Sequence, residues 1–136
     1  MRCLWTSIFG AALLFSCVAT GAQVATQQPT ATPGYRQLVP GLLTRSRFAA
    51  QAAGGRRIEL WDLLVGPGRR SGDATLPGAA VFEVRGGTGR IVIDGKEQEL
   101  RSGATLPVPE RASFQLINTR TDLGLSIRAT VIVGAR

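Results

Sequence analysis

The sequence contains no histidine among its 136 residues and a single lysine, Lys96. The absence of imidazole excludes a Ser-His-Asp triad, because such a triad needs a histidine to take the serine proton. It also removes the commonest side-chain ligand of transition metals in proteins. Any general acid–base chemistry would therefore fall to aspartate, glutamate, Lys96 or Tyr35.

Cysteine is nearly as scarce, and its two copies, Cys3 and Cys17, both lie near the N-terminus. They precede the point at which we expect the chain to be cleaved, so the processed protein would contain no thiol. A disulfide framework, a thiolate metal site and a cysteine nucleophile are then excluded. The folding free energy must come from an apolar core, which a chain of about 110 residues is long enough to bury.

The first 22 residues have the composition of a secretory signal peptide. Arg2 supplies a positive charge, an apolar run follows over residues 8–18, and small residues occupy 19–22. A membrane-spanning helix needs roughly 20 apolar residues, and the shortness of this run argues against an uncleaved anchor or a buried helix. We expect cleavage near Ala22 and a periplasmic or secreted protein without a transmembrane span after cleavage.

Residues 14–17 read Leu-Phe-Ser-Cys, which loosely resembles a bacterial lipobox. In that alternative, Cys17 would carry a lipid anchor. Residues 23–34 are polar, contain proline and lack an apolar period, as is typical of a flexible linker. The folded domain is therefore expected over residues 35–136.

The formal net charge is +7, and apart from Lys96 every basic residue is an arginine. The arginines lie singly or in pairs, such as Arg56-Arg57 and Arg69-Arg70, and no basic run is interleaved with aromatic residues. This pattern indicates a solvated surface, not a nucleic-acid partner.

From residue 57 onward, short β-type runs alternate with glycine and proline. We predict strands at 58–65, 80–85, 90–93, 96–100, 104–108, 114–118 and 123–133, after an initial strand at 37–39 and a loop or short helical turn. Asp94-Gly95 is predicted to form a two-residue hairpin turn, because both residues tolerate a positive φ. Turns every ~8–12 residues are typical of a sandwich or barrel. The predicted fold is all-β, a small antiparallel β-barrel or double-sheet jelly roll.

The order and spacing of these turns resemble those of the small single-domain cupins over residues 58–133. The first motif of that family runs from a Pro-Gly turn to a strand closed by glycine, as Pro67-Gly68 and residues 81–86 do here. The second motif has turn residues at fixed offsets, and these offsets are occupied by Gly103, Pro109 and Asn118. The segment 91–103 is similar to the hairpin that cupins carry between the motifs. The resemblance implies a cupin-like β-barrel.

The positions at which cupins carry metal ligands are occupied by other residues. Asp73 and Thr75 stand at the two histidine positions of the first motif, Ala79 stands at the glutamate position, and Phe114 stands at the last histidine position. A cupin metal site needs three or four imidazole and carboxylate ligands. We therefore predict a domain without a metal or another cofactor.

Glu83 is a candidate for a functional carboxylate. Alternate residues of a strand share a face, so Glu83 lines up with Ala79, and the resemblance places position 79 inside the barrel. On this argument Glu83 would point inward, with Arg128 or Arg90 supplying the opposite charge. We favour the other interpretation, in which Glu83 is paired and inert at the mouth of the barrel or at a dimer edge.

The other candidates for a ligand pocket are Trp61, Asp73, Thr75, Phe114, Asn118 and Arg128. Asp73 is placed to hydrogen-bond a ligand, or it belongs to an ordinary Ser-Gly-Asp turn. Phe114 either fills the former metal cavity as core or forms the wall of an apolar pocket. Asn118 is expected to fix the turn at Thr119 by bonding the backbone.

These observations favour a non-catalytic, metal-free module that serves in binding or in structure. Its partner would be a small organic or weakly acidic molecule held in the barrel, or another envelope protein. The open alternative is a metal-independent isomerase or epimerase that uses a carboxylate and an arginine, since the fold does not determine the activity. We also expect a homodimer, because small cupins often pair by exchanging or abutting edge strands, and pairing covers an exposed sheet edge.

Overall fold

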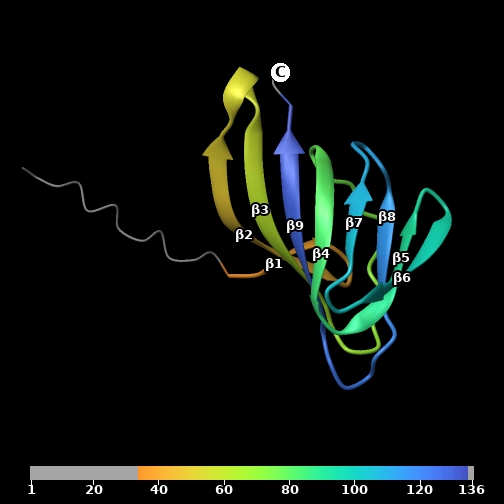
Figure 1. Ribbon diagram of the computed structural model, residues 1–136. Coiled ribbons are helices and arrows are strands. Elements are labelled where there is room, and N and C mark those ends of the chain that lie inside the picture. Colours follow the sequence, from red (N-terminus) through yellow and green to blue (C-terminus); the bar gives the residue numbers. More distant parts are fainter. Residues whose placement is uncertain (1–33, 135–136) are drawn as a thin grey trace, which may run out of the picture.

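The computed structural model describes residues 34–134. The predicted signal peptide, all of the predicted linker except Gly34, and the last two residues lie outside the described part. Within that part the chain forms nine strands and one short 3-10 helix (Figure 1). The elements are β1 (Arg36–Val39), β2 (Leu42–Gln51), η1 (Ala53–Gly55), β3 (Arg57–Val65), β4 (Ala79–Gly86), β5 (Thr88–Ile93), β6 (Lys96–Arg101), β7 (Thr105–Val108), β8 (Phe114–Asn118) and β9 (Leu125–Val133).

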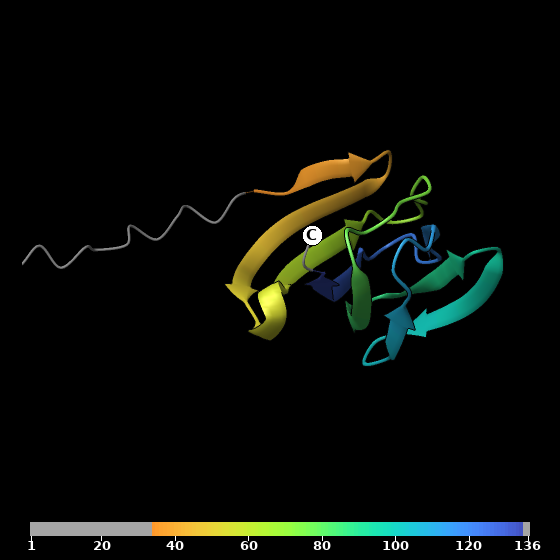
Figure 2. The same ribbon diagram turned by 90° about the horizontal axis from the view of Figure 1, so that it is seen from above.

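The strands form two antiparallel sheets, and the predicted all-β, double-sheet fold is confirmed. The larger sheet has the order β1-β2-β3-β9-β4-β7, and the smaller sheet has the order β6-β5-β8. Figures 1 and 2 show the two sheets curving around a common interior, with the β2–β3 hairpin extending beyond the smaller sheet. One face of the larger sheet, here called the inner face, is therefore turned toward the smaller sheet, and the opposite, outer face is turned away from it.

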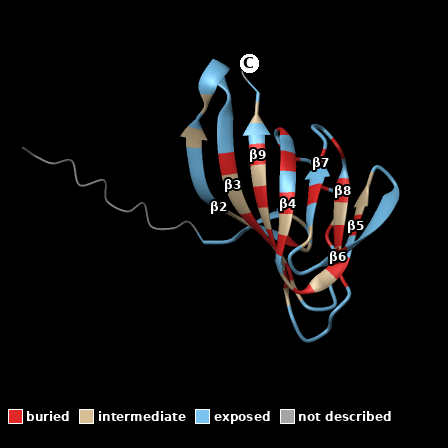
Figure 3. Cartoon of the chain, viewed as in Figure 1, coloured by how far each residue is buried: buried red, intermediate tan, exposed pale blue. Residues whose placement is uncertain are grey.

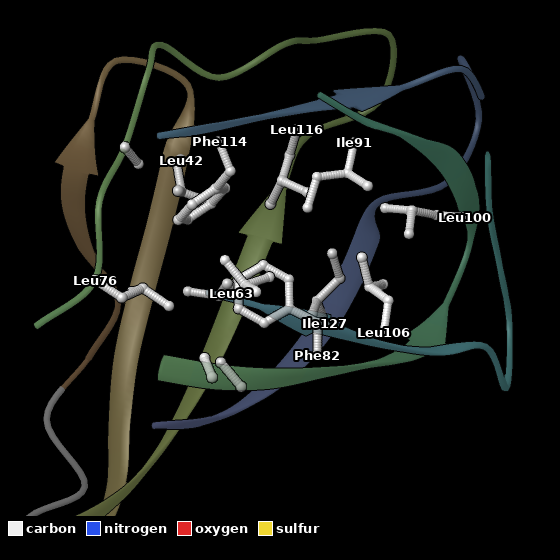
Figure 4. Close-up of a cluster of buried hydrophobic side chains, with 14 of the residues drawn as sticks. Leu42, Leu63, Leu76, Phe82, Ile91, Leu100, Leu106, Phe114, Leu116 and Ile127 are labelled. Carbon is white, nitrogen blue, oxygen red and sulfur yellow. The ribbon is translucent and has the colours of Figure 1, made fainter. Parts of the chain in front are cut away.

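The core lies between the two sheets and is built from alternate residues of the strands. In β4 the buried set is Ala80, Phe82 and Val84, and in β9 every odd-numbered residue from Leu125 to Val131 is buried. Figure 3 shows this alternation as red bands separated by pale blue in β4 and by tan in β9. Large apolar side chains from both sheets fill the centre, including Leu42, Leu63, Phe82, Ile91, Phe114, Leu116 and Ile127 (Figure 4).

The turn predicted at Asp94-Gly95 is present between β5 and β6. Both residues have positive φ angles, 46° and 80°, as a two-residue turn of the mirror-image type requires. The register continues from Ile93 opposite Lys96 to Thr88 opposite Arg101. The predicted hairpin is confirmed.

Residues 42–51, expected to be a loop or helical turn, form the long strand β2, so that prediction was wrong. Gly41, with φ of 79°, reverses the chain after β1, and β2 then pairs with β3 along almost its whole length. The pairing shifts between Ser46 and Phe48, which marks a β-bulge. An extra residue in a strand breaks the period-2 alternation, and this is why the sequence lacked a strand pattern here.

In the described part of the chain, no helix has the length and apolar character needed to cross a membrane.

Candidate functional site

The interior around Phe114, where the resemblance to cupins would place a metal, is filled by aromatic core. Phe114 is 1% exposed, and its ring meets that of Phe82 edge to face, with 5.3 Å between the ring centroids. Ala74 and Leu76 are buried beside the motif positions, and Ala74 pairs with Phe114 through an isolated bridge. These side chains offer no oxygen or nitrogen ligand, so the residues present do not fit the metal that the fold family implies. Phe114 fills this space as core and does not line an open pocket.

Asp73 and Thr75 lie on the outside of the molecule. The segment alternates, with Asp73 and Thr75 exposed and Ala74 and Leu76 buried. The two polar residues that occupy the histidine positions therefore point away from the interior that Phe114 fills. The structure does not bring Asp73 and Thr75 together with Phe114.

Glu83 lies on the outer face of the larger sheet, so the inward orientation considered for it is wrong, whereas the favoured interpretation of a paired side chain agrees with the structure. The expected alternation holds, since Ala79, Val81 and Glu83 do share a face, but the buried face is that of Phe82 and its neighbours. Arg85 Nη1 donates to Glu83 Oε1 at 3.1 Å, and the side chains of both residues are about half exposed. The pair is an ordinary surface ion pair. The sequence did carry a signal for the outward orientation, namely two charged residues, Glu83 and Arg85, on the same face of β4. Charged side chains favour the face of a strand that is exposed to water.

Asn118 holds the loop that leads from β8 to β9. It is buried, and its Nδ2 donates to the carbonyl oxygens of Val65, Gly66 and Leu123 at 3.2, 3.0 and 2.7 Å. Its Oδ1 accepts a hydrogen bond from the backbone N–H of Arg120 at 3.0 Å. The predicted backbone bonding at this turn is confirmed, and Asn118 also ties the loop to the end of β3.

Asp62 is the centre of an arginine cluster on the outer face that the sequence analysis did not identify. Arg45 Nη2 donates to Asp62 Oδ2 at 2.9 Å, and Arg128 Nε donates to Asp62 Oδ1 at 3.3 Å. Arg47 Nε lies 3.6 Å from Asp62 Oδ2, and the Arg45 guanidinium stacks 4.6 Å from the ring centroid of Tyr35. The available signal was a lone carboxylate in an otherwise apolar strand segment, because such a group needs a cationic partner.

The pKa of Asp62 reflects two opposed effects. Burial of the carboxylate acts to raise its pKa, but the hydrogen bonds and charges of Arg45 and Arg128 outweigh burial and hold the pKa below its ordinary value. The same hydrogen bond raises the pKa of Arg45. Asp62 is therefore an ionised anchor for the arginines and is not poised to exchange a proton near neutral pH.

Trp61 lines a cleft at the open edge of the inner face. Its neighbour across the β2–β3 pairing is Ser46, and one step along the sheet Thr44 lies opposite Arg36 of β1. Together with Gln37 and Leu38, these residues enclose a cleft of about 270 Å³. Trp61 is partly buried and packs against the core with part of its surface. Of the candidates from the sequence, only Trp61 lies in this cleft; Asn118 and Phe114 are buried elsewhere, and Glu83 and Arg128 are on the outer face.

Glu59 supports Trp61 from the same face of β3. It is 8% exposed, and its Oε2 accepts a hydrogen bond from Trp61 Nε1 at 2.9 Å. Arg57 forms an ion pair with the other carboxylate oxygen. Both oxygens of this buried carboxylate are thus engaged, and the indole orientation is fixed by the bond. The cleft consequently combines a fixed aromatic ring with Arg36, Thr44 and Ser46, and the Thr44 hydroxyl donates to the Arg36 carbonyl oxygen at 3.4 Å.

Within residues 34–134, no three cysteine, aspartate or glutamate side chains gather in a way that could hold a metal ion.

No known family profile matches the sequence, and no curated protein matches it. Solved structures do match the fold. The cupin domain of Cnp3 from Schizosaccharomyces pombe is 10% identical, covers 76% of this chain and 69% of its own, and gives a TM-score of 0.60. A cupin-2 domain from Rhodospirillum rubrum is 16% identical, covers 77% of this chain and 65% of its own, and gives a TM-score of 0.57. An RmlC-like cupin from Shewanella frigidimarina is 15% identical, covers 73% of this chain and 82% of its own, and gives a TM-score of 0.56. The chain therefore has a cupin-like fold.

Proposed function

We propose that this chain is an exported, cupin-fold module without catalytic activity that binds a small, weakly acidic organic molecule. The observation that carries the proposal is the pairing of a closed interior with an open cleft. Phe114 and Phe82 occupy the space that a cupin enzyme would use for chemistry, whereas Arg36 and Trp61 line a cleft at the rim. The ligand therefore binds at the rim and not inside the barrel, where it was expected from the sequence.

The cleft residues suit a particular ligand chemistry. A guanidinium recognises a carboxylate through parallel hydrogen bonds, so Arg36 would hold an acid group. The ring of Trp61 offers an apolar surface to a flat or aliphatic body, and the hydroxyls of Thr44 and Ser46 both donate and accept hydrogen bonds. Because drug-sized ligands occupy clefts of about 300–1,000 Å³, a cleft of about 270 Å³ favours a smaller molecule.

The metal-independent enzyme is the less favoured reading. It needs an inward carboxylate next to an arginine, but Glu83 lies outside and is bonded to Arg85. Asp73 is also exposed. Glu59 is a buried carboxylate close to the cleft, but both of its oxygens are already bonded to Trp61 and Arg57. None of the three is a free carboxylate placed to move a substrate proton.

The binding proposal is tested with untagged protein and a panel of small aromatic and aliphatic monocarboxylic acids, each with its methyl ester, by calorimetry and thermal shift. We expect binding of at least one acid, and loss of binding for its ester, for Arg36→Ala and for Trp61→Ala. Trp61→Phe should keep most of the affinity, because it retains an aromatic surface. Arg120→Ala is the matched control, since Arg120 is paired with Asp122 on an exposed loop and lies outside the cleft lining. Binding unchanged in Arg36→Ala would refute the cleft, and turnover of any acid would favour the enzyme.

Export is tested separately by the denatured mass of untagged protein recovered from the envelope of its own host. The proposal expects cleavage near Ala22, which removes both cysteines. A mass that begins at Cys17 and carries acyl chains would establish the lipid anchor instead. A full-length, unmodified mass would refute export. A native mass on the same sample reports any ligand retained during purification, including a metal, which would overturn the metal-free reading.

A further inference from the structure

Two apolar rows cross the outer face of the larger sheet near the turn between β2 and β3. The exposed fractions are 56% for Phe48, 36% for Ile58, 45% for Val81 and 45% for Ile132. The register places Ile58 opposite Ile132 in the row nearer to the turn, and it aligns Phe48 with Val81 in the next row. We call these four residues the outer patch. Exposed apolar patches that span several strands commonly mark interaction surfaces.

An arginine-rich row crosses the same strands farther from the turn. Asp62 lies in its middle, and its two carboxylate oxygens accept hydrogen bonds from Arg45 and Arg128. Arg47 is the residue that the register of β2 skips at the bulge. Its Nε lies 3.6 Å from Asp62 Oδ2, which is an ion-pair distance but too long for a hydrogen bond. One carboxylate thus gathers three guanidinium groups, and it neutralises the charge of one.

The other charged residues of this face leave the surplus unchanged. Arg85 donates to Glu83 at 3.1 Å, so this pair is neutral as a whole. The described strands β2, β3, β9 and β4 therefore present four arginines and two acids on the outer face, a surplus of two positive charges. The turn at residues 51–56 adds Arg56 and contains no acidic residue. This end of the outer face consequently attracts anions.

We propose that this end of the outer face docks on the surface of a membrane that contains anionic lipids. The outer patch enters the boundary between headgroups and acyl chains, and Arg47 and Arg128 contact the lipid phosphates. Successive rows on one face of a strand lie about 7 Å apart, and amphipathic elements bury their apolar face about 5–10 Å into this boundary. The step from the row of Phe48 to the row of Asp62 therefore matches that depth. Figure 1 shows the turn between β2 and β3 projecting beyond the smaller sheet, which leaves this end accessible.

The order of the rows favours a membrane over a soluble anion. A free phosphate or an acidic peptide would satisfy the arginines alone, whereas a membrane presents acyl chains beneath its phosphates and accepts both kinds of row. The chain also enters the domain beside the arginine row, because the Arg45 guanidinium stacks 4.6 Å from the ring centroid of Tyr35. A lipid on Cys17, the alternative considered for the N-terminal segment, would thus hold this face near the membrane.

The test of the arginines is flotation of the untagged, processed protein with two kinds of vesicle. One contains equal parts of phosphatidylglycerol and phosphatidylcholine, and the other contains phosphatidylcholine alone. We expect binding to the anionic vesicles to be at least about tenfold tighter, and added salt should reduce the difference. An acyl chain on Cys17 would bind both kinds of vesicle, so the comparison reports the protein surface.

Arg47→Gln and Arg128→Gln should each weaken binding to the anionic vesicles about fivefold, the effect of one basic residue near an anionic surface. Arg101→Gln is the matched control, since Arg101 forms an exposed pair with Glu99 on the smaller sheet. Circular dichroism checks that the variants are folded. Arg47→Gln serves if Arg128→Gln is not, because Arg47 makes the longer contact with Asp62.

The outer patch is tested in the same assay. Phe48→Ser and Ile132→Ser should each weaken binding at least about fivefold, because each removes apolar area that the membrane would cover. Leu123→Ser is the matched control, since Leu123 is 48% exposed but lies in the loop before β9. Phe48→Trp in a Trp61→Phe background reports depth. Its fluorescence should shift to the blue on anionic vesicles and be quenched by lipids brominated on their acyl chains, whereas Leu123→Trp should show neither effect.

Several outcomes would overturn the proposal. Protein that binds neither kind of vesicle would do so, as would binding that no variant of the outer face weakens. Binding of glycerol phosphate at matched ionic strength, without binding to vesicles, would assign the arginines to a soluble phosphate. Binding of polyglutamate but not of vesicles would assign them to an acidic protein. The acid-binding cleft at Trp61 lies on the inner face, so failure of one proposal leaves the other standing.

Discussion

The rings of Phe82 and Phe114 meet edge to face with 5.3 Å between their centroids, and each ring comes from a different sheet. Both residues are almost completely buried. Aromatic pairs in this geometry add about 0.5–1.5 kcal/mol beyond the burial of their area. The contact thus fastens one sheet to the other.

Phe114→Ala is expected to lower the free energy of unfolding by about 3–5 kcal/mol, because it opens a cavity in the core. Denaturant unfolding followed by fluorescence or circular dichroism measures the loss. Phe48→Ala removes the same ring from an exposed position on the outer face of the larger sheet and is the control, with an expected change of less than about 1 kcal/mol. Equal losses in the two variants would mean that Phe114 is not a core residue.

Asp62 is expected to make stability depend on pH in the acidic range. Its pKa in the folded protein lies below that of an unfolded chain, about 3.9, so its contribution is complete above that value and is lost as the pH falls through the lower, folded pKa. Asp62→Asn should therefore destabilise the protein at pH 7 and flatten the decline of stability below about pH 4. Urea unfolding at a series of pH values measures both effects.

The control for this prediction is Asp122→Asn. The pKa of Asp122 is also lowered, by its hydrogen bond from Arg120, but this pair lies on an exposed loop where water screens it. The change in acid dependence should be clearly smaller than for Asp62→Asn. An acid profile that Asp62→Asn leaves unaltered would contradict the role given to the cluster.

Asn118→Ala is expected to cost about 2–4 kcal/mol of unfolding free energy, because it leaves buried carbonyl groups without their donor. Asn118→Asp should also destabilise, since a carboxylate cannot donate to the three carbonyl oxygens that the amide now serves. Hydrogen exchange would then show faster opening of the loop between β8 and β9. Slow exchange in both variants would indicate that other contacts hold this loop.

Gly89→Ala is expected to destabilise by about 2 kcal/mol or more, because overpacking forces the backbone to move. A Cβ at this position would lie 2.3 Å from the carbonyl oxygen of Ile117 in the neighbouring strand. Gly86 provides the contrast, since a Cβ there meets nothing within 4 Å. Gly86→Ala should be neutral or slightly stabilising, because alanine restricts the unfolded chain. Thermal melts of the two variants compare the positions directly.

The places where the chain turns were predictable, because a turn depends on local chemistry. Asp94-Gly95 reversed the chain where its tolerance of positive φ indicated, and the strand at 114–118 was predicted with the limits that β8 has. Strand β2 was missed because its bulge between Ser46 and Phe48 erases the alternation that identifies a strand. A local rule fails when one extra residue shifts the pattern.

The sequence by itself determined which chemical groups and local elements are available. It has no imidazole for metal or triad chemistry, its cysteines are confined to the predicted signal peptide, and its short strands are separated by glycine and proline. Only the tertiary structure decided which face of each strand is inside. The alternation of residues in β4 predicts that Ala79, Val81 and Glu83 share a face. It does not predict that the opposite face packs against Phe114. The Asp62 cluster and the Trp61 cleft were likewise decided by sheet register. The register joins Arg45 and Asp62, from the consecutive strands β2 and β3, to Arg128 of β9, which lies 66 residues beyond Asp62 in the chain. Such pairings are set by packing of the whole domain and leave no local pattern in the sequence.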